Sequence, residues 1–147
     1  MTEMLARETC VPCRGGIPPL SLDEAKRYLE QTPGWALQDD GTRLERTFWF
    51  ANFRGALDFA HAVGELAEAE FHHPDIAFSW GRATISLRTN KINGLHRNDF
   101  IMAAKIDHIA RAHDAQYSRP ERRKAAEAAM AGDTRPSGGS TAGQQFT

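Results

Sequence analysis

The feature that most constrains the fold of this chain is a long helix-like segment placed between two pairs of strand-like segments. The helix-like segment runs from about residue 53 to residue 69 and follows Asn52, a residue type that favours the N-cap of a helix. Its apolar positions are Phe53, Ala56, Leu57, Ala60, Val63, Leu66 and Ala67. They recur every three or four residues, and this period predicts a helix with one face packed on a core.

Two pairs of short segments with the residue pattern of β-strands flank this helix. Residues 35–37 and 44–50 precede it, and residues 75–80 and 83–88 follow it. Within each pair a short turn that contains glycine joins the two segments, which is typical of a β-hairpin. Because the strands of a hairpin are antiparallel, the sequence predicts an antiparallel sheet.

Two further helices complete the expected order of elements. Ser21 is followed three residues later by Glu24, a capping box that predicts a helix over residues 22–30. Another helical pattern covers about residues 97–113. The order helix, two strands, helix, two strands, helix predicts an α+β domain, with a four-stranded antiparallel sheet and three helices packed on one face.

The composition of the chain changes at both ends. Residues 1–20 include a stretch rich in glycine and proline and are expected to form an extended N-terminal arm. Residues 21–117 form the expected α+β domain, and residues 118–147 a short helix followed by a disordered tail. The tail has the composition of a spacer, although Phe146 near its end leaves a partner-binding segment as the alternative.

The overall composition argues against several classes of partner. The formal net charge of the 147-residue chain is −1, and basic residues are interspersed with acidic ones, so no nucleic-acid partner is expected. No apolar run approaches the ~20 residues that cross a membrane, and the first residues lack the basic and apolar regions of a signal peptide. We therefore expect a cytoplasmic protein with no membrane partner.

Cys10 and Cys13 form a Cys-x-x-Cys pair in the arm. A structural zinc site needs four ligands, and the sequence has no second cysteine pair, so no metal site is expected. A thioredoxin-like redox motif would follow a strand and open a helix, whereas this pair lies beside glycines and prolines. A structural role in packing the arm is favoured over metal or redox chemistry, which stays open.

Two adjacent histidines, His72 and His73, lie between the central helix and the third strand and precede Pro74. Histidine has an ordinary pKa of about 6.5, so its side chain serves as an acid or a base near neutral pH. Glu68 lies one helical turn before His72, where its carboxylate can orient an imidazole. The histidine pair is therefore the leading candidate for catalysis.

A larger set of residues around the histidines is similar to the motif of the pterin-4a-carbinolamine dehydratases. In chain order this set is Glu68, His72, His73, Pro74, Trp80, Asn90 and Asp99. Matching segments outside the set are Pro33-Gly34-Trp35, Asn93-Gly94-Leu95 and Ala103-Ala104-Lys105-Ile106-Asp107. The resemblance covers most of residues 10–113. It implies the family's architecture of four strands and three helices, a homodimer whose sheets continue across the interface, and dimers that pair into tetramers.

The resemblance also implies a reaction, the dehydration of 4a-hydroxytetrahydropterin to quinonoid dihydropterin. This reaction removes a proton from a ring nitrogen and expels hydroxide as water, so it needs a base and an acid but no metal or other cofactor. By this resemblance His72 and His73 are the catalytic residues. The implied pterin-binding residues are Glu68, Pro74, Phe78, Trp80, Asn90 and Asp99. Asp99 also falls in the first turn of the last helix, where a carboxylate favours the helix dipole, so a capping role is an equally good interpretation.

Asn90 departs from the family pattern, which usually has a third active-site histidine at this position. An amide can hydrogen-bond a pterin, but it cannot transfer a proton as imidazole does. A positioned acid or base contributes about 10²–10⁴ in rate, so its loss would cripple catalysis while binding survives. His96 lies in the same corner of the chain, but nothing in its spacing puts it in the vacated position.

Two hypotheses for function follow from this substitution. In the first, the chain has a degraded catalytic site and is a non-catalytic assembly factor, or chaperone, for RuBisCO. It would resemble the dehydratase-like branch associated with α-carboxysomes, with the RuBisCO large subunit as its partner and carboxysome-associated localisation. In the second, the chain is an active, slow 4a-hydroxytetrahydropterin dehydratase that uses His72 and His73 alone and binds a pterin. The loss of a proton-transfer group and the added tail favour the first hypothesis, since fold does not fix function.

Overall fold

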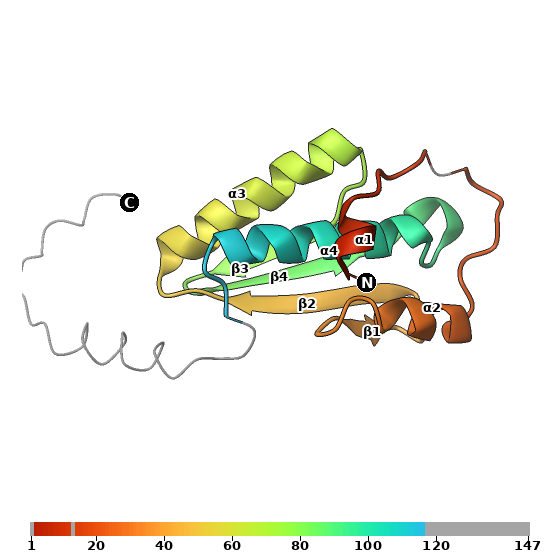
Figure 1. Cartoon of the computed structure of the whole chain (residues 1–147), viewed down its shortest axis with the longest axis horizontal. Coiled ribbons are helices and arrows are strands. Elements are labelled where there is room, and N and C mark those ends of the chain that lie inside the picture. Colours follow the sequence, from red (N-terminus) through yellow and green to blue (C-terminus); the bar gives the residue numbers. More distant parts are fainter. Residues whose placement is uncertain (1, 13, 117–147) are drawn as a thin grey trace, which may run out of the picture.

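The computed structural model describes residues 2–12 and 14–116 (Figure 1). Its helices are α1 (Thr2–Ala6), α2 (Leu22–Leu29), α3 (Phe53–Glu70), the 3₁₀ turn η1 (Asn90–Ile92) and α4 (Arg97–Ala112). Its strands are β1 (Ala36–Gln38), β2 (Arg43–Trp49), β3 (Asp75–Ser79) and β4 (Arg82–Leu87). The predicted strands and the predicted helices before residue 117 are all present, and their ends lie within one residue of the expected positions. The predicted helix and tail after residue 117 lie outside the described residues.

The four strands form one antiparallel sheet in the order β1-β2-β4-β3. The central strands β2 and β4 pair with Leu44 opposite Leu87 and Phe48 opposite Ala83. Alternate residues of a strand face opposite sides, so these four side chains share one face of the sheet, and all four are buried. Figure 1 shows α3 and α4 lying over the sheet. The structure therefore confirms the predicted α+β fold.

The opposite face of the sheet carries mainly polar side chains. The hydroxyls of Thr47 and Thr84 lie 2.8 Å apart in a cross-strand hydrogen bond. Arg43 donates from Nη1 to the hydroxyl of Ser86 at 3.0 Å. The same alternation that buries the apolar residues beneath the helices thus leaves hydrogen-bonding groups on this face.

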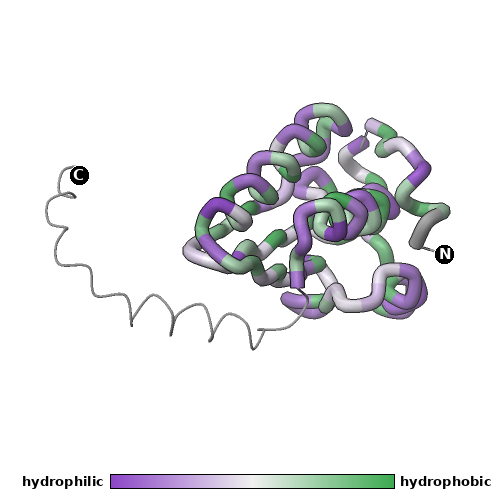
Figure 2. Tube along the Cα trace, turned by 60° about the vertical axis from the view of Figure 1, so that its left-hand side comes forward, coloured by the Kyte–Doolittle hydropathy of each residue, from purple (hydrophilic) through white to green (hydrophobic). Residues whose placement is uncertain are grey.

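Helix α3 covers the sheet with one apolar face. In Figure 2 hydrophobic and hydrophilic segments alternate along α3, as expected of a helix that turns a single stripe toward the core. The ring of Phe59 on this stripe lies 4.9 Å from that of Phe48 and 5.1 Å from that of Phe50, measured between centroids. Within the described part of the chain, no helix is both long and apolar enough to cross a membrane.

Side-chain caps determine where α2 and α3 begin. The Ser21 hydroxyl accepts the N–H of Glu24 at 3.1 Å, and the Glu24 carboxylate accepts the N–H of Ser21 at 2.8 Å, so the predicted capping box is present. The Asn52 side chain accepts the N–H of Gly55 at 2.8 Å. These bonds satisfy backbone donors that the first turn of a helix leaves without partners.

The N-terminal arm differs from the expected extended segment, because its first residues form α1. Leu5 on this helix is only 1% exposed and belongs to the hydrophobic core. Lys105 of α4 donates from Nζ to the carbonyl of Ala6 at 2.8 Å, which holds the end of α1. The prediction of an extended arm was wrong for residues 2–6, because their helix is stabilised by contact with α4, about a hundred residues later in the sequence.

A charged cluster joins β2 to α4 inside the core. Asp107 accepts hydrogen bonds from the Trp35 indole at 2.9 Å and from Arg46 Nη1 at 3.2 Å. Burial raises the pKa of Asp107 from its ordinary 3.8 to about 6, although Arg46 and Trp35 oppose this shift. The carboxyl group therefore binds a proton more tightly in the folded protein than in the unfolded chain.

This shift predicts a contribution to stability that depends on pH. The raised pKa contributes stability that is fully present below pH 4 and is lost as the pH rises through about 6. We expect the free energy of unfolding of the wild type, relative to that of Asp107→Asn, to fall by on the order of 1–3 kcal/mol across this interval. Urea unfolding of both proteins from pH 4 to pH 7 measures this difference, and a flat or rising difference would contradict the assignment.

Candidate active site

The two histidines lie where α3 ends and the chain turns into β3. Phe71 at the helix end has a left-handed backbone, with φ 54°, and the N–H of His72 donates to the carbonyl of Ala67 at 3.1 Å. This hydrogen bond and the left-handed residue reverse the chain, as is typical of a helix C-terminus. Pro74 then leads into β3. His72 and His73 therefore lie at the end of the sheet, beside the point where β4 runs into η1.

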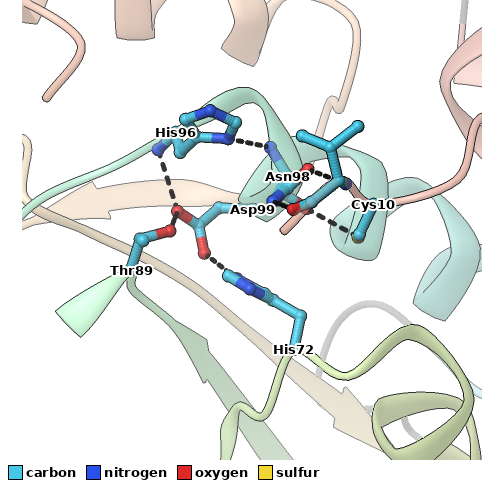
Figure 3. A network of polar contacts seen from close by, with 7 residues as sticks. Cys10, His72, Thr89, His96, Asn98 and Asp99 are labelled. Carbon is cyan, nitrogen blue, oxygen red and sulfur yellow. Dashed lines mark hydrogen bonds and ion pairs between the residues drawn. The ribbon is translucent and has the colours of Figure 1, made fainter. Parts of the chain in front are cut away.

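His72 is held by a buried carboxylate. Its Nε2 lies 2.7 Å from Oδ1 of Asp99, whose side chain is 0% exposed. The other oxygen of Asp99 accepts the Thr89 hydroxyl at 2.7 Å and the N–H of His96 at 2.9 Å (Figure 3). The contact with the N–H of His96 is half of a capping box at the start of α4. Asp99 thus makes the helix cap considered from the sequence, and it also contacts an imidazole, which the sequence did not predict. Its part in pterin binding stays a prediction.

His73 forms a second pair with a carboxylate, but near the surface. Its Nε2 lies 2.6 Å from Oε2 of Glu68, and both side chains are exposed. The edge of the Phe71 ring packs against the His73 ring, with centroids 5.6 Å apart. An exposed ion pair is worth little stability, so this pair orients a ring rather than supporting the fold.

Both histidines line a pocket of about 450 Å³ at this end of the sheet. Its wall is formed by the end of α3, the segment from β4 into η1, and a short stretch of the N-terminal arm. The lining residues are Cys10, Val11, Pro12, Glu70, Phe71, His72, His73, Arg88, Thr89, Asn90 and Lys91. The pocket therefore brings Asn90 together with the two histidines, as the sequence predicted.

The remaining predicted site residues are divided between two places. Glu68 and Asp99 contact the two imidazoles, and Pro74 directly follows them. Phe78 and Trp80 lie further along the chain, and Phe78 is four positions after Pro74, which is about 13 Å along an extended strand. The ring of Phe78 packs against Phe53 at the start of α3, with centroids 5.6 Å apart. Neither Phe78 nor Trp80 lines this pocket, and their part in pterin binding stays a prediction.

Several lining residues were not identified from the sequence. Arg88 and Thr89 directly precede Asn90, so the end of β4 was the signal that could have found them. Phe71 is 85% exposed at the rim, and an aromatic residue at a helix end that usually carries glycine or asparagine was a further signal. The arm residues lie some sixty positions before the histidines, and no local pattern predicts their contact with the pocket.

Each of the two imidazoles has one ring nitrogen outside its carboxylate contact. Each uses Nε2 for a carboxylate, so Nδ1 is the second titratable nitrogen of each ring. A neutral ring that donates its Nε2 proton to a carboxylate has a basic Nδ1, and the same atom carries the proton when the ring is charged. Among the residues that the structure describes, no three His, Cys, Asp or Glu side chains gather as a metal site. The arrangement can supply acid and base groups to a ligand in the pocket.

Comparison with known proteins identifies the family. Residues 18–109 match the family model described as "Pterin 4 alpha carbinolamine dehydratase". A protein of Cupriavidus pinatubonensis named "Putative pterin-4-alpha-carbinolamine dehydratase 1" is 60% identical over 110 residues, which cover 75% of this chain and 95% of that protein. A relative from Aromatoleum aromaticum, named "Putative pterin-4-alpha-carbinolamine dehydratase", is 56% identical over 110 residues. The match covers 75% of this chain and 98% of the relative. The chain belongs to the pterin 4 alpha carbinolamine dehydratase family.

A solved structure agrees with this assignment. The crystal structure of a transcriptional coactivator/pterin dehydratase from Brucella melitensis matches with a TM-score of 0.60 and 30% identity, over 63% of this chain and 98% of that one. A pterin dehydratase-like protein described as a RuBisCO assembly factor in the alpha-carboxysome matches with a TM-score of 0.46 and 25% identity. That match covers 52% of this chain and 88% of the other.

The different burial of the two carboxylates predicts different effects on stability. In Asp99→Asn the amide places donor hydrogens among groups that donate to Asp99, so we expect a loss of about 1–3 kcal/mol in the free energy of unfolding. Glu68→Gln is the matched control, and we expect it to change stability by less than about 0.5 kcal/mol because its pair is exposed. Urea unfolding of both variants measures the difference, and equal effects would contradict the structural role of Asp99.

Proposed function

We propose that this protein catalyses the dehydration of a 4a-hydroxytetrahydropterin, with His72 and His73 as its acid and base. The observation that carries the proposal is that two imidazoles, each held by its own carboxylate, line one pocket. Membership of the dehydratase family supplies the substrate class. Between the two hypotheses drawn from the sequence, this geometry supports the active enzyme, because both imidazoles line the pocket and each keeps a carboxylate partner.

The reaction breaks one N–H bond and one C–O bond of the substrate. One imidazole, neutral at the start, takes the proton from the ring nitrogen next to the 4a carbon. The electron pair released forms the new carbon–nitrogen double bond and expels the 4a-hydroxyl group. The other imidazole, protonated at the start, gives its proton to the departing hydroxide, so the products are water and the quinonoid dihydropterin. Two groups with pKa values near the working pH are sufficient for this exchange.

Asn90 lies in the same pocket and can hydrogen-bond the substrate, but it does not exchange protons. Its amide offers both a donor and an acceptor to the polar edge of a pterin. In this proposal the two histidines carry the proton transfers, and the absence of a third imidazole lowers the rate without abolishing the reaction.

Replacing His72 tests the enzyme directly. We expect His72→Ala to lower kcat by about 10²–10⁴, the usual contribution of a positioned acid or base. His61→Ala is the control, because His61 is exposed on α3 and pairs with Glu65. The measurement is the dehydration of a 4a-hydroxytetrahydropterin, corrected for the uncatalysed reaction. Wild-type protein that gives no acceleration over that background would overturn the proposal.

Restoring an imidazole at residue 90 tests the cost of the substitution. We expect Asn90→His to raise kcat by about tenfold or more, since a third proton-transfer group would line the pocket. A rate that does not rise would mean that Asn90 is not what limits turnover. A variant that is active when the wild type is not would instead support the degraded-site hypothesis.

The role in RuBisCO assembly, with carboxysome association and the RuBisCO large subunit as partner, stays a prediction from the sequence. The likeness at a TM-score of 0.46 is too loose to favour it. The expected homodimer and tetramer also stay predictions. Co-expression with RuBisCO subunits measures the assembly role. A higher yield of assembled RuBisCO, kept in His72→Ala, would support a role independent of the histidines, and an unchanged yield would count against it.

A further inference from the structure

Part of the wall of the candidate pocket comes from the N-terminal arm, outside the predicted α+β domain. Cys10, Val11 and Pro12 line the pocket together with His72 and His73. The side chain of Val11 is exposed, so with Pro12 it gives this side of the pocket an apolar surface. The imidazoles and the polar residues that follow β4 line other parts of the pocket. The arm therefore bounds the space available to a ligand.

One buried side chain clamps this part of the arm. Asn98, which is 1% exposed, accepts the N–H of Val11 with Oδ1 at 3.0 Å and donates from Nδ2 to the carbonyl of Val11 at 2.7 Å. The amide thus pairs with both backbone groups of a single residue, as a neighbouring strand would. The N–H of Cys10 adds a bond to Glu70 Oε1 at 2.8 Å. The wall is held from α4 on one side and from the end of α3 on the other.

The arm is also anchored on both sides of the clamp. Before it, Leu5 is buried in the core, and Arg97 forms an ion pair with Glu8. After it, the N–H of Leu20 donates to the carbonyl of Leu95 at 2.9 Å. These contacts attach both flanks of the arm to the α+β domain, and the clamp fixes Val11 itself against α4.

The clamp on the arm and the contact with His72 come from adjacent residues of α4. Asn98 holds the arm, and the next residue, Asp99, holds His72 (Figure 3). The two contacts use different side chains, so a change at Asn98 can release the arm while Asp99 still orients the imidazole. This separation allows binding and proton transfer to be disturbed independently.

We propose that residues 10–12 form a fixed wall of the pterin pocket and that Asn98 is the positioning residue that holds this wall in place. The proposal rests on the proposed function for its ligand, a flat pterin ring. Asn98 sets the affinity for that ring and does not take part in proton transfer.

Two substitutions break the clamp from opposite sides. Asn98→Leu keeps the approximate size of the side chain but removes both hydrogen bonds, and Val11→Pro removes the N–H that Asn98 accepts. For each variant we expect KM, and the Kd for the fluorescent compound pterin, to rise about tenfold, with kcat within about threefold of the wild type. Val11→Ala, which keeps the N–H, is the matched control for the loss of side-chain surface.

The double variant tests whether the two changes act on the same contact. If both act through the clamp, Asn98→Leu combined with Val11→Pro raises KM by no more than about twice the larger single effect. Effects that multiply would overturn the clamp as their shared cause. A variant that lowers kcat as strongly as it raises KM would assign Asn98 to the support of His72 instead of the arm.

Cys10 supplies a readout that does not depend on catalysis. Burial, together with the nearby Glu70 carboxylate, raises the pKa of the Cys10 thiol to about 12, so the thiol stays protonated and reacts slowly with iodoacetamide. In a Cys13→Ser background, we expect Asn98→Leu to raise the alkylation rate of Cys10 at least about tenfold by exposing the arm. Mass spectrometry of the intact protein measures this rate.

The two readouts distinguish failure of this proposal from failure of the proposed function. An alkylation rate unchanged by Asn98→Leu would overturn the clamp, whatever the activity. Faster alkylation with an unchanged Kd for pterin would overturn the arm as a wall of the pterin site. Wild-type protein that neither binds pterin nor accelerates dehydration would overturn the proposed function and the pterin as ligand, while the alkylation rates still decide the clamp.

Discussion

The structure around the pocket depends on one buried carboxylate. Asp99 accepts hydrogen bonds from the end of β4 through Thr89, from the start of α4 through His96, and contacts the imidazole of His72. The cap at His96 is local, but His72 lies 27 positions before Asp99, and no local preference would bring this imidazole to the carboxylate. A buried carboxylate is stable only when its oxygens are well bonded, so the geometry of the helix start and that of the imidazole are fixed by the same requirement.

The fold was predictable because each element has a local signal. Apolar periodicity defined α3 and α4, Ser21 and Asn52 marked helix starts, and the glycine turns marked the hairpins. Helix α1 was not predictable, because five residues do not form a stable helix alone and the burial of Leu5 depends on α4. Local sequence therefore specified the domain but not the segment that is stabilised only by tertiary contacts.

The candidate site also has parts that local sequence predicts and parts that depend on tertiary contacts. His72, His73 and Asn90 lie in one pocket because the end of α3 and the end of β4 meet at one end of the sheet, which the order of elements implies. The arm wall depends on Asn98, which lies 87 positions after Val11, so no sequence spacing predicts their contact. A residue that is close to the site in sequence can still lie at the far end of the strand that leaves the site. Phe78 is such a residue, because its ring packs against Phe53 at the start of α3.

Phe71 shows a conflict between stability and the composition of the pocket rim. Its left-handed backbone, with φ 54°, is one that a residue with a Cβ adopts at a cost of about 1–2 kcal/mol, and its ring is almost fully exposed. Glycine or asparagine would end the helix at lower cost. Selection for thermal stability alone would therefore remove the aromatic ring beside His73, and a library screened only for folding should drift away from this rim. Engineering of this scaffold should screen for ligand binding and stability together.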